Sequence, residues 1–264
     1  MSGFSHAAVR LGLRIPVELR RFPPVRGLAD LLVPREGRTW ARVARGAGSG
    51  LWLSVATRVP WPPDGPEPHV QSALCEVLKP GATFCDVGAN LGFFSLLAAR
   101  LVGPYGRVYA FEPDPQARQW LEEASRRNRL AIDIVGVAVW HADSMVPFRR
   151  ANPAHSPDLG TGAVVRNHRT PGTIAVRAVT LDGFFAARTN RIEEDLVIKV
   201  DAEGSELAVL QGAAGVLASR RAAWIVEVHE PHGAEPVEAI FAHLGYSVRP
   251  LLGDRSGQHL FAIP

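Results

Sequence analysis

The 264-residue chain has few cysteines and no long hydrophobic run, and each absence excludes a class of protein. No stretch of about 18 apolar residues is available to span a bilayer, so we expect neither a transmembrane helix nor a membrane partner. Two cysteines, Cys75 and Cys85, are too few for a disulfide framework and favour a reducing compartment, the cytoplasm. The N-terminal stretch also lacks the continuous apolar segment of a secretion signal.

Lysine is scarce as well, because only Lys79 and Lys199 are lysines among the 29 basic residues. The arginines are scattered between acidic residues, and the formal net charge is only +3. Since a nucleic-acid-binding surface needs a basic patch or stripe, we expect no nucleic-acid partner. Lys199 is unusual for its position, in the middle of the apolar stretch DLVIKVD.

Apolar stretches typical of buried strands alternate with helical patterns from residue 66 to residue 264. The strands are predicted in ATFCDVG, GRVYAFEP, AIDIVGVAV, DLVIKVD, AAWIVEVHE, YSVRPLL and QHLFAIP. Parallel neighbours need a crossover connection, usually a helix, so this order predicts a doubly wound, mostly parallel α/β sheet. We expect a Rossmann-like fold with an antiparallel C-terminal strand.

Two other regions depart from this alternation. Residues 1–65 are rich in Arg and Pro, and we predict an N-terminal appendage with a helix and a hairpin around AGSG, on the possible substrate side. Residues 66–264 form the main domain, with an insertion over 141–191 in which VPFRRA and TIAVRAVTL could pair. The Gly-containing stretch His155–Gly172 is a candidate cover for the substrate.

The sharpest motif is CDVGANLGFF, at the first strand-to-helix turn, where Gly88 and Gly92 permit a tight turn and a close ligand. Glu112, at the end of the next strand, is placed to accept hydrogen bonds from two ribose hydroxyls. A dinucleotide site would need a glycine where Asn90 stands. S-adenosyl-methionine has no phosphate, and its positive charges suit the carboxylate of Asp86, so we expect this donor rather than NAD.

Polar side chains gather at the predicted carboxyl ends of the later strands, where open α/β sheets bind ligands. They are Asp201, Glu203, Glu227, His229 and Glu230. A hydroxyl acceptor needs a base, which His229 could supply unless it is structural; Glu203 instead could cap the following helix. A divalent metal such as Mg²⁺ is an open alternative, because it acidifies a hydroxyl without a strong base.

Lys199 shares a strand face with Asp201, since side chains alternate along a strand. We therefore expect the two to form a polar pair. Either this pair positions the acceptor hydroxyl and helps to deprotonate it, or it is a structural ion pair in the core.

The order of FCDVGANLGFFSL, VYAFEPDP, VTLDGF, IKVDAEGSELAVLQGA and IVEVHE resembles that of the FkbM family of methyltransferases, over about residues 67–230. The resemblance implies a class I methyltransferase fold, S-adenosyl-methionine as donor, and O-methylation of a hydroxyl on a polyketide, sugar or other secondary metabolite. It also assigns residues to the donor. They are Asp86, Gly88, Asn90, Gly92 and Phe93 on the loop, Glu112, Pro113 and Asp114 at the ribose turn, and Val137 and Ala138 beside the adenine.

The acceptor itself is not specified by these motifs. An N- or carboxyl-methyltransferase remains an alternative, as does a catalytically silent nucleoside-binding subunit, whereas Asn90 disfavours an NAD-dependent oxidoreductase. The catalytic candidates are Lys199, Asp201, Glu203 and His229. The oligomeric state stays open, with a homodimer as one option.

Overall fold

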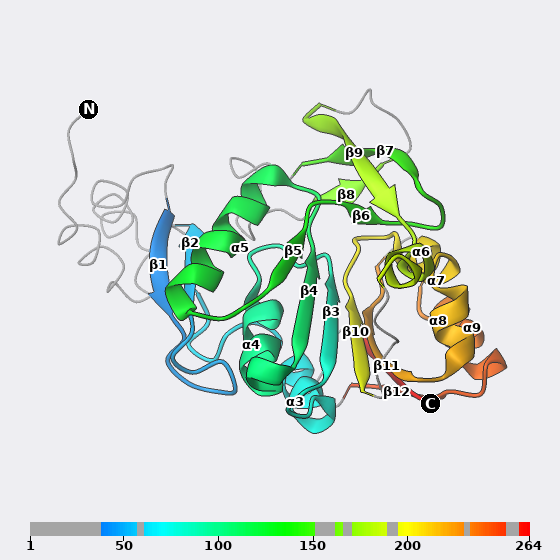
Figure 1. The fold of residues 1–264 in the computed structure, drawn as a ribbon, viewed down its shortest axis with the longest axis horizontal. Coiled ribbons are helices and arrows are strands. Elements are labelled where there is room, and N and C mark those ends of the chain that lie inside the picture. The colour runs from blue at the N-terminus through cyan, green and yellow to red at the C-terminus, as the bar shows by residue number, and fades with distance from the viewer. Residues whose placement is uncertain are drawn as a thin grey trace, which may run out of the picture.

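The computed structural model describes residues 38–56, 61–150, 162–165, 171–188, 195–229, 233–251 and 259–264. Its main sheet has seven strands in the order β12-β13-β11-β10-β3-β4-β5 (Figure 1). Their bounds are β3 (Thr83–Val87), β4 (Arg107–Phe111), β5 (Asp133–Val135), β10 (Leu196–Val200), β11 (Ala222–Glu227), β12 (Ser247–Pro250) and β13 (His259–Ile263).

All neighbours in this sheet are parallel except those of β13, which runs antiparallel to both β11 and β12. The chain starts in the middle at β3, moves outward to β5, and returns through β10 to the other edge. The prediction of a doubly wound, mostly parallel sheet with an antiparallel C-terminal strand is therefore confirmed. No helix among the described residues is long and apolar enough to cross a membrane.

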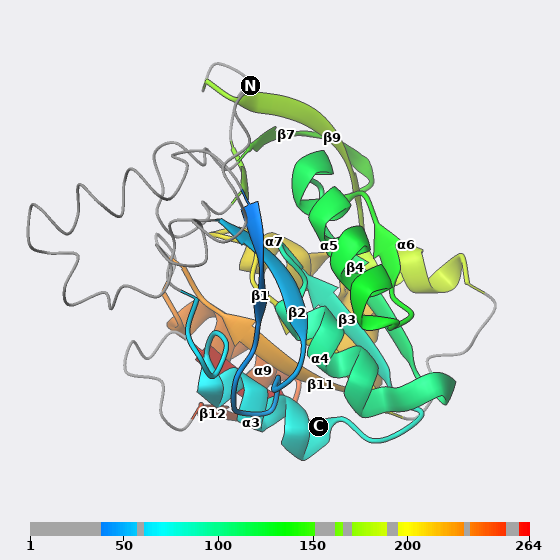
Figure 2. The ribbon, with the colours of Figure 1, turned by 90° about the vertical axis from the view of Figure 1, so that its left-hand side faces the viewer.

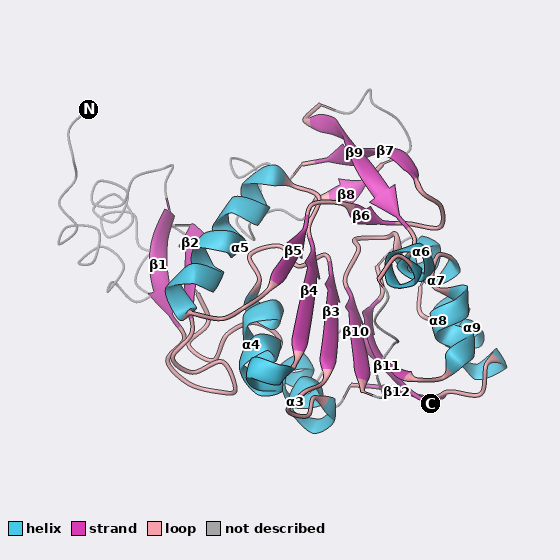
Figure 3. Ribbon diagram, in the orientation of Figure 1, coloured by secondary structure: helices cyan, strands magenta, loops and turns pink. Residues whose placement is uncertain are grey.

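Helices cover both faces of the sheet (Figures 1 and 3). Alternate strand residues separate the two faces, because Phe84 contributes to one hydrophobic cluster and its neighbour Cys85 to the other. The first face holds α3 (Pro68–Val77), α4 (Phe93–Val102) and α5 (Pro115–Asn128), with the short 3₁₀ turn η2 (Gly103–Tyr105) after α4. The second holds α6 (Leu181–Ala186), α7 (Glu206–Gln211), α8 (Ala214–Ser219) and α9 (Glu235–His243).

A second sheet has the strand order β6-β9-β7-β8 and lies beyond the end of β5 (Figure 1). It contains β6 (Ala138–Val139), β7 (Ser144–Arg149), β8 (Ala163–Val164) and β9 (Thr173–Val179). The predicted pairing within the insertion is confirmed, because β7 and β9 are antiparallel. Most of the predicted cover, residues 155–161 and 166–170, lies outside the described residues.

The single strand predicted over AIDIVGVAV is wrong, because the chain leaves one sheet and enters the other at Gly136. The amide of Val137 donates to the carbonyl of Val135 at 2.9 Å, which closes a tight turn. A side chain at Gly136 would meet the Arg118 guanidinium at 2.7 Å. Both flanking residues are valines, so the apolar pattern continues through the turn and hides it.

The segment ELAVLQGAAGVLAS has the apolar spacing of a single helix but forms two, α7 and α8, with a break at Gly212. A Cβ on Gly212 would lie 2.0 Å from the carbonyl oxygen of Trp140. The carboxylate of Asp182, from α6, accepts hydrogen bonds from the amides of Gly215 and Val216 at 2.7 and 2.9 Å. These contacts give the VTLDGF and QGA motifs a structural role as a clasp between α6 and α8.

The predicted N-terminal hairpin is confirmed as β1 (Arg38–Arg42) and β2 (Trp52–Ala56), which are antiparallel. It lies against the α4 and α5 side of the main sheet (Figure 2). Asn128 of α5 bonds to the backbone of Trp52 in both directions, at 2.8 and 2.7 Å. Leu53 and Val55 belong to the first hydrophobic cluster, so the hairpin shares a core with the domain. The predicted helix within residues 1–37 lies outside the described residues.

Candidate functional site

The turn after β3 brings two strand ends together. The amides of Gly88 and Ala89 both donate to the carbonyl of Phe111 at 3.0 Å. Gly88 has a φ of 81°, and a Cβ there would lie 1.9 Å from the carbonyl oxygen of Asp201. This glycine is therefore needed so that the turns after β3 and β10 can touch. Asn90 follows in a left-handed conformation, with a φ of 48°.

The carboxylate of Glu112 braces this turn. It accepts hydrogen bonds from the amides of Asn90 and Asp114, each at 2.8 Å. Burial raises the pKa of Glu112 to about 7, against the lowering effect of these two bonds. Each carboxylate oxygen retains a second acceptor direction, so the group can still receive a ligand hydroxyl.

A pocket opens at the carboxyl ends of β3, β4 and β10. Five predicted donor residues line it, and Phe148, Gly162 and Val164, in or next to the second sheet, were missed by sequence reasoning. Apart from Glu112 and Asp201 the lining residues are apolar or small, a surface chemistry that suits a nucleoside. The predicted residues at the wall are Gly88, Glu112, Pro113, Val137 and Ala138, and the others are Val87, Phe111, Val139, Asp201, Ala202 and Ser205.

Other predicted donor residues lie elsewhere among the described residues. Phe93 begins α4, and its ring packs in the first hydrophobic cluster with its centroid 6.2 Å from that of Trp61, so its side chain is not part of the pocket lining. Leu121 leaves little room for a side chain at Gly92, because an added Cβ would lie 2.0 Å from its Cδ1. Asp114 caps α5, accepting from the amide of Gln116 at 2.8 Å, and binds Arg150 with both oxygens at 3.1 Å.

Lys199 and Asp201 form the predicted polar pair, with Nζ and Oδ2 2.9 Å apart. The lysine is 1% exposed and stands beside Asp86 on the neighbouring strand. Burial lowers the pKa of Lys199, but the negative charges of Asp201, Asp86 and Glu67 outweigh this effect and hold the pKa above its ordinary value. Asp86 accepts from the hydroxyl of Ser95 at 2.5 Å, while its Oδ1 finds no partner among the described residues.

An acidic cluster surrounds His229 at the end of β11. Its Nδ1 lies 3.0 Å from the Glu206 carboxylate, and its Nε2 lies 3.6 Å from Glu203 and 3.5 Å from Glu227. The hydrogen bond that His229 donates to Glu206, offset in part by burial, and the nearby carboxylates raise the pKa of His229 to about 9. The negative charge of these carboxylates favours a cation beside them. In the turn before α7, the Glu206 carboxylate accepts a hydrogen bond from the amide of Gly204 at 3.0 Å.

A second cluster adjoins the first and was missed from the sequence. His259 of β13 lies 3.2 Å from Glu67 and 3.3 Å from Glu227 through Nε2, and 3.2 Å from His69 through Nδ1. Burial lowers the pKa of His259, but Glu227 and Glu67 outweigh it and raise the value to about 10. Glu227 thus bridges the two histidines. Glu230, also expected at this edge, lies outside the described residues.

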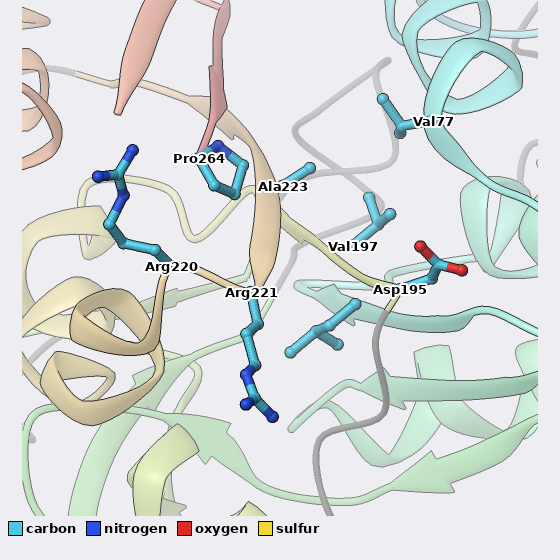
Figure 4. Close-up of a pocket in the computed structure, with 8 residues that line it drawn as sticks. Val77, Asp195, Val197, Arg220, Arg221, Ala223 and Pro264 are labelled. Atoms are coloured by element: carbon cyan, nitrogen blue, oxygen red, sulfur yellow. The ribbon is translucent and has the colours of Figure 1, made fainter. Parts of the chain in front are cut away.

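Another hollow lies at the amino ends of the strands, where β10 and β11 begin (Figure 4). Its walls include Val77, Val197 and Ala223, and the arginines Arg220 and Arg221 point away from one another there. In open α/β sheets, ligands bind at the opposite, carboxyl ends of the strands. We therefore place the candidate site at the pocket beside Glu112 and Asp201.

The strand order, the glycine turn and the buried carboxylate after β4 define a class I, Rossmann-like methyltransferase fold. A family model described as the methyltransferase FkbM domain matches residues 86–248. The chain therefore belongs to the FkbM family of S-adenosyl-methionine-dependent methyltransferases.

Individual relatives are more distant. A protein-L-isoaspartate O-methyltransferase of Methanothrix thermoacetophila is 33% identical over 137 residues, which cover 49% of this chain and 60% of the relative. The hexuronic acid methyltransferase AglP of Haloferax volcanii is 27% identical over 176 residues, or 64% of each chain. The match thus spans less than two thirds of either relative. The FkbM methyltransferase structure from Methylobacillus flagellatus is 17% identical, with a TM-score of 0.47 over 73% of this chain and 50% of that one.

Proposed function

We propose that this chain is an S-adenosyl-methionine-dependent O-methyltransferase that acts on a hydroxyl of a small molecule. The observation that carries the proposal is the position of Asp201, which lines the nucleoside pocket and also belongs to the acidic cluster. A donor and an acceptor bound at these two places would meet at this residue. The partner is thus a small hydroxylated metabolite.

The pocket has the groups that the donor requires. Glu112 offers its carboxylate to the ribose hydroxyls, while Val137, Ala138 and Val139 offer an apolar surface to the adenine. When bound, the donor supplies a methyl group whose bond to sulfur breaks, leaving the electron pair on sulfur, as the bond to the acceptor oxygen forms. The chain's own tasks are to orient the acceptor and to take up its proton.

The acidic cluster is suited to those tasks. Lys199 holds one oxygen of Asp201 at 2.9 Å, so the position of that carboxylate is fixed. We assign the contact with the acceptor hydroxyl to Asp201 and Glu203, with His229 beside them, and a carboxylate of this cluster accepts the proton. Unlike the buried Lys199, Asp201 and Glu203 can be reached by a ligand, because each of these side chains is 22% exposed.

The names of two relatives indicate different kinds of methyl acceptor. One is named for a hexuronic acid and another for an isoaspartyl protein. A carboxyl acceptor is already ionised at neutral pH and needs no base, whereas a sugar hydroxyl does. The dense carboxylate cluster at the acceptor end therefore favours a hydroxyl, with a polyketide or a sugar as the secondary-metabolite class.

The proposal is tested with a donor that carries an isotopically labelled methyl group, incubated with the enzyme and extracts or sugar acids. We expect a labelled product that survives mild alkali, because a methyl ether is stable where a methyl ester hydrolyses. Release of the label by alkali would instead identify a carboxyl-methyltransferase. Binding of S-adenosyl-homocysteine without any labelled product would identify a silent subunit. The exposed Glu76→Gln variant serves as a surface control.

A further inference from the structure

Three side chains of the acidic cluster present ligand atoms to one point. Asp201, Glu203 and His229 each offer one such atom, and the three lie within 4.8 Å of one another. Two come from the turn after β10 and one follows β11, so backbone elements fix all three positions. Carboxylates suit Mg²⁺ and Mn²⁺, and an imidazole is a common further ligand for transition metals.

The orientation of His229 supports a ligand role. Its Nδ1 is held at 3.0 Å by Glu206, a carboxylate that is only 1% exposed and is itself fixed by the Gly204 amide. A metal-binding histidine is usually oriented in this way, by a carboxylate on its other nitrogen. The arrangement directs Nε2 toward the carboxylates of Glu203 and Glu227.

The two carboxylates that face Nε2 lie beyond the usual length of a hydrogen bond. Nε2 lies 3.6 Å from Glu203 and 3.5 Å from Glu227. In an octahedral site with bonds of about 2.1 Å, adjacent ligand atoms are about 3.0 Å apart. Binding of a cation therefore requires these side chains to move closer together by about half an ångström.

The neighbouring cluster differs in this respect. Both ring nitrogens of His259 lie at hydrogen-bond distance, 3.2 Å, from a partner, Glu67 on one side and His69 on the other. A cation there would have to replace contacts that the chain already makes. The two clusters are therefore distinguishable, and only the one around His229 faces the pocket through Asp201.

We propose that Asp201, Glu203 and His229 bind a divalent cation, Mg²⁺ or Mn²⁺, with Glu206 as the positioning residue. Resting on the proposed function, this identifies the acceptor class as one with two neighbouring oxygens, such as a vicinal diol or an α-hydroxy acid, which can chelate the cation. The cation lowers the pKa of the bound hydroxyl, whose proton then passes to a carboxylate of the cluster. Lys199 keeps Oδ2 of Asp201 and leaves Oδ1 for the cation.

The test is the binding of Mn²⁺ alone to the full chain, followed by electron paramagnetic resonance and calorimetry without donor or acceptor. We expect about one bound ion per chain, and at least about ten-fold weaker binding in Asp201→Asn, Glu203→Gln and His229→Gln. Glu206→Gln should weaken binding about 10- to 100-fold, the range for a group that orients a ligand. The exposed Glu76→Gln variant should bind as the parent does, and circular dichroism confirms that each variant is folded.

Two results would overturn the cation site. One is a folded parent chain that does not bind Mn²⁺. The other is loss of binding in Glu67→Gln with retention in Asp201→Asn, which would move the ion to the neighbouring cluster. Methyl transfer that persists in a chelator would refute the role of the cation in the reaction and leave the proposed function standing. Failure of a Mn²⁺-binding chain to bind S-adenosyl-homocysteine would instead refute the proposed function, and with it the role of the cation in the reaction.

Discussion

Gly88 and Asp201 are in direct backbone contact, because the Asp201 carbonyl oxygen occupies the place that a Cβ on Gly88 would take, 1.9 Å from it. This contact joins the donor loop after β3 to the acidic turn after β10. The Asp201 amide also donates to Val87 at 3.0 Å, so the two turns are bonded as well as touching.

Gly88→Ala should therefore damage both stability and donor binding. The left-handed backbone costs a non-glycine residue about 1–2 kcal/mol, and the collision with a fixed carbonyl adds about 1–3 kcal/mol. Gly81→Ala is the matched control, because Gly81 has a φ of 90° with nothing within 4 Å. Chemical denaturation should show the smaller loss for the control, and equal losses would contradict the contact.

Glu112 should make donor binding depend on pH near neutrality. With its pKa raised to about 7, the carboxyl is largely protonated at pH 6 and ionised at pH 8. Ribose hydroxyls donate to the ionised form, so S-adenosyl-homocysteine should bind about ten-fold more weakly at pH 6 than at pH 8. Calorimetry of the parent and of Glu112→Gln measures this, and a pH dependence that persists in the variant would refute the assignment.

The same group affects stability in the free chain. Because its folded pKa lies above the ordinary value of 4.5 that it has in the unfolded chain, its contribution to stability is present below pH 4.5 and is lost as pH rises through 7. Thermal melts of the parent should decline over this window more than those of Glu112→Gln. Added S-adenosyl-homocysteine should reduce the difference, since binding compensates the ionised carboxylate.

Lys199→Met should abolish turnover and destabilise the fold. Removing one partner of a buried pair typically costs about 3–5 kcal/mol, and here it leaves Asp86 and Asp201 without their shared cation. Lys79→Met is the matched control, because Lys79 is exposed on the surface. The double variant Lys199→Met, Asp86→Asn removes opposite charges together and should recover part of the stability. Turnover in either folded variant would show that the lysine is only scaffold.

Arg150→Ala should weaken donor binding several-fold with little effect on stability. Arg150 holds Asp114 with two bonds of 3.1 Å and so ties the second sheet to the rim of the pocket, but its side chain is 40% exposed. An ion pair of this exposure contributes about 0–1 kcal/mol. Arg149→Ala, at the exposed neighbouring position, should leave donor affinity unchanged. An equal effect of both substitutions would exclude a specific role for the pair.

Local patterns in the sequence predicted most of the fold. The alternation of apolar stretches located the strands of the main sheet. The turn at Gly136 was missed because Val135 and Val137 continue the apolar run, and the choice between sheets is made by tertiary contacts. The break at Gly212 was missed for a similar reason, since only the carbonyl of Trp140 excludes a side chain there.

The candidate site was predicted in part. Lys199 and Asp201 were paired from strand periodicity, because they are two residues apart. His259 and its partners Glu67 and His69 were not found, since 190 residues separate the two histidines and neither carries a local motif. The burial of the Phe93 ring was not predicted, because a residue beside a glycine loop can point to either side of the helix that follows.

The position of β13 between β11 and β12 has a consequence for how the molecule is assembled. β12 precedes β13 in the chain, yet it has no partner in the main sheet until β13 is in place. Synthesis and assembly therefore run in opposite orders at this edge, and β12 must wait on the ribosome with an unpaired backbone. Since β13 also delivers His259 to Glu227 and Glu67, these carboxylates gain this partner only at that moment. A chain that stops before residue 259 should consequently expose a strand edge and lack one of the groups that offset this negative charge.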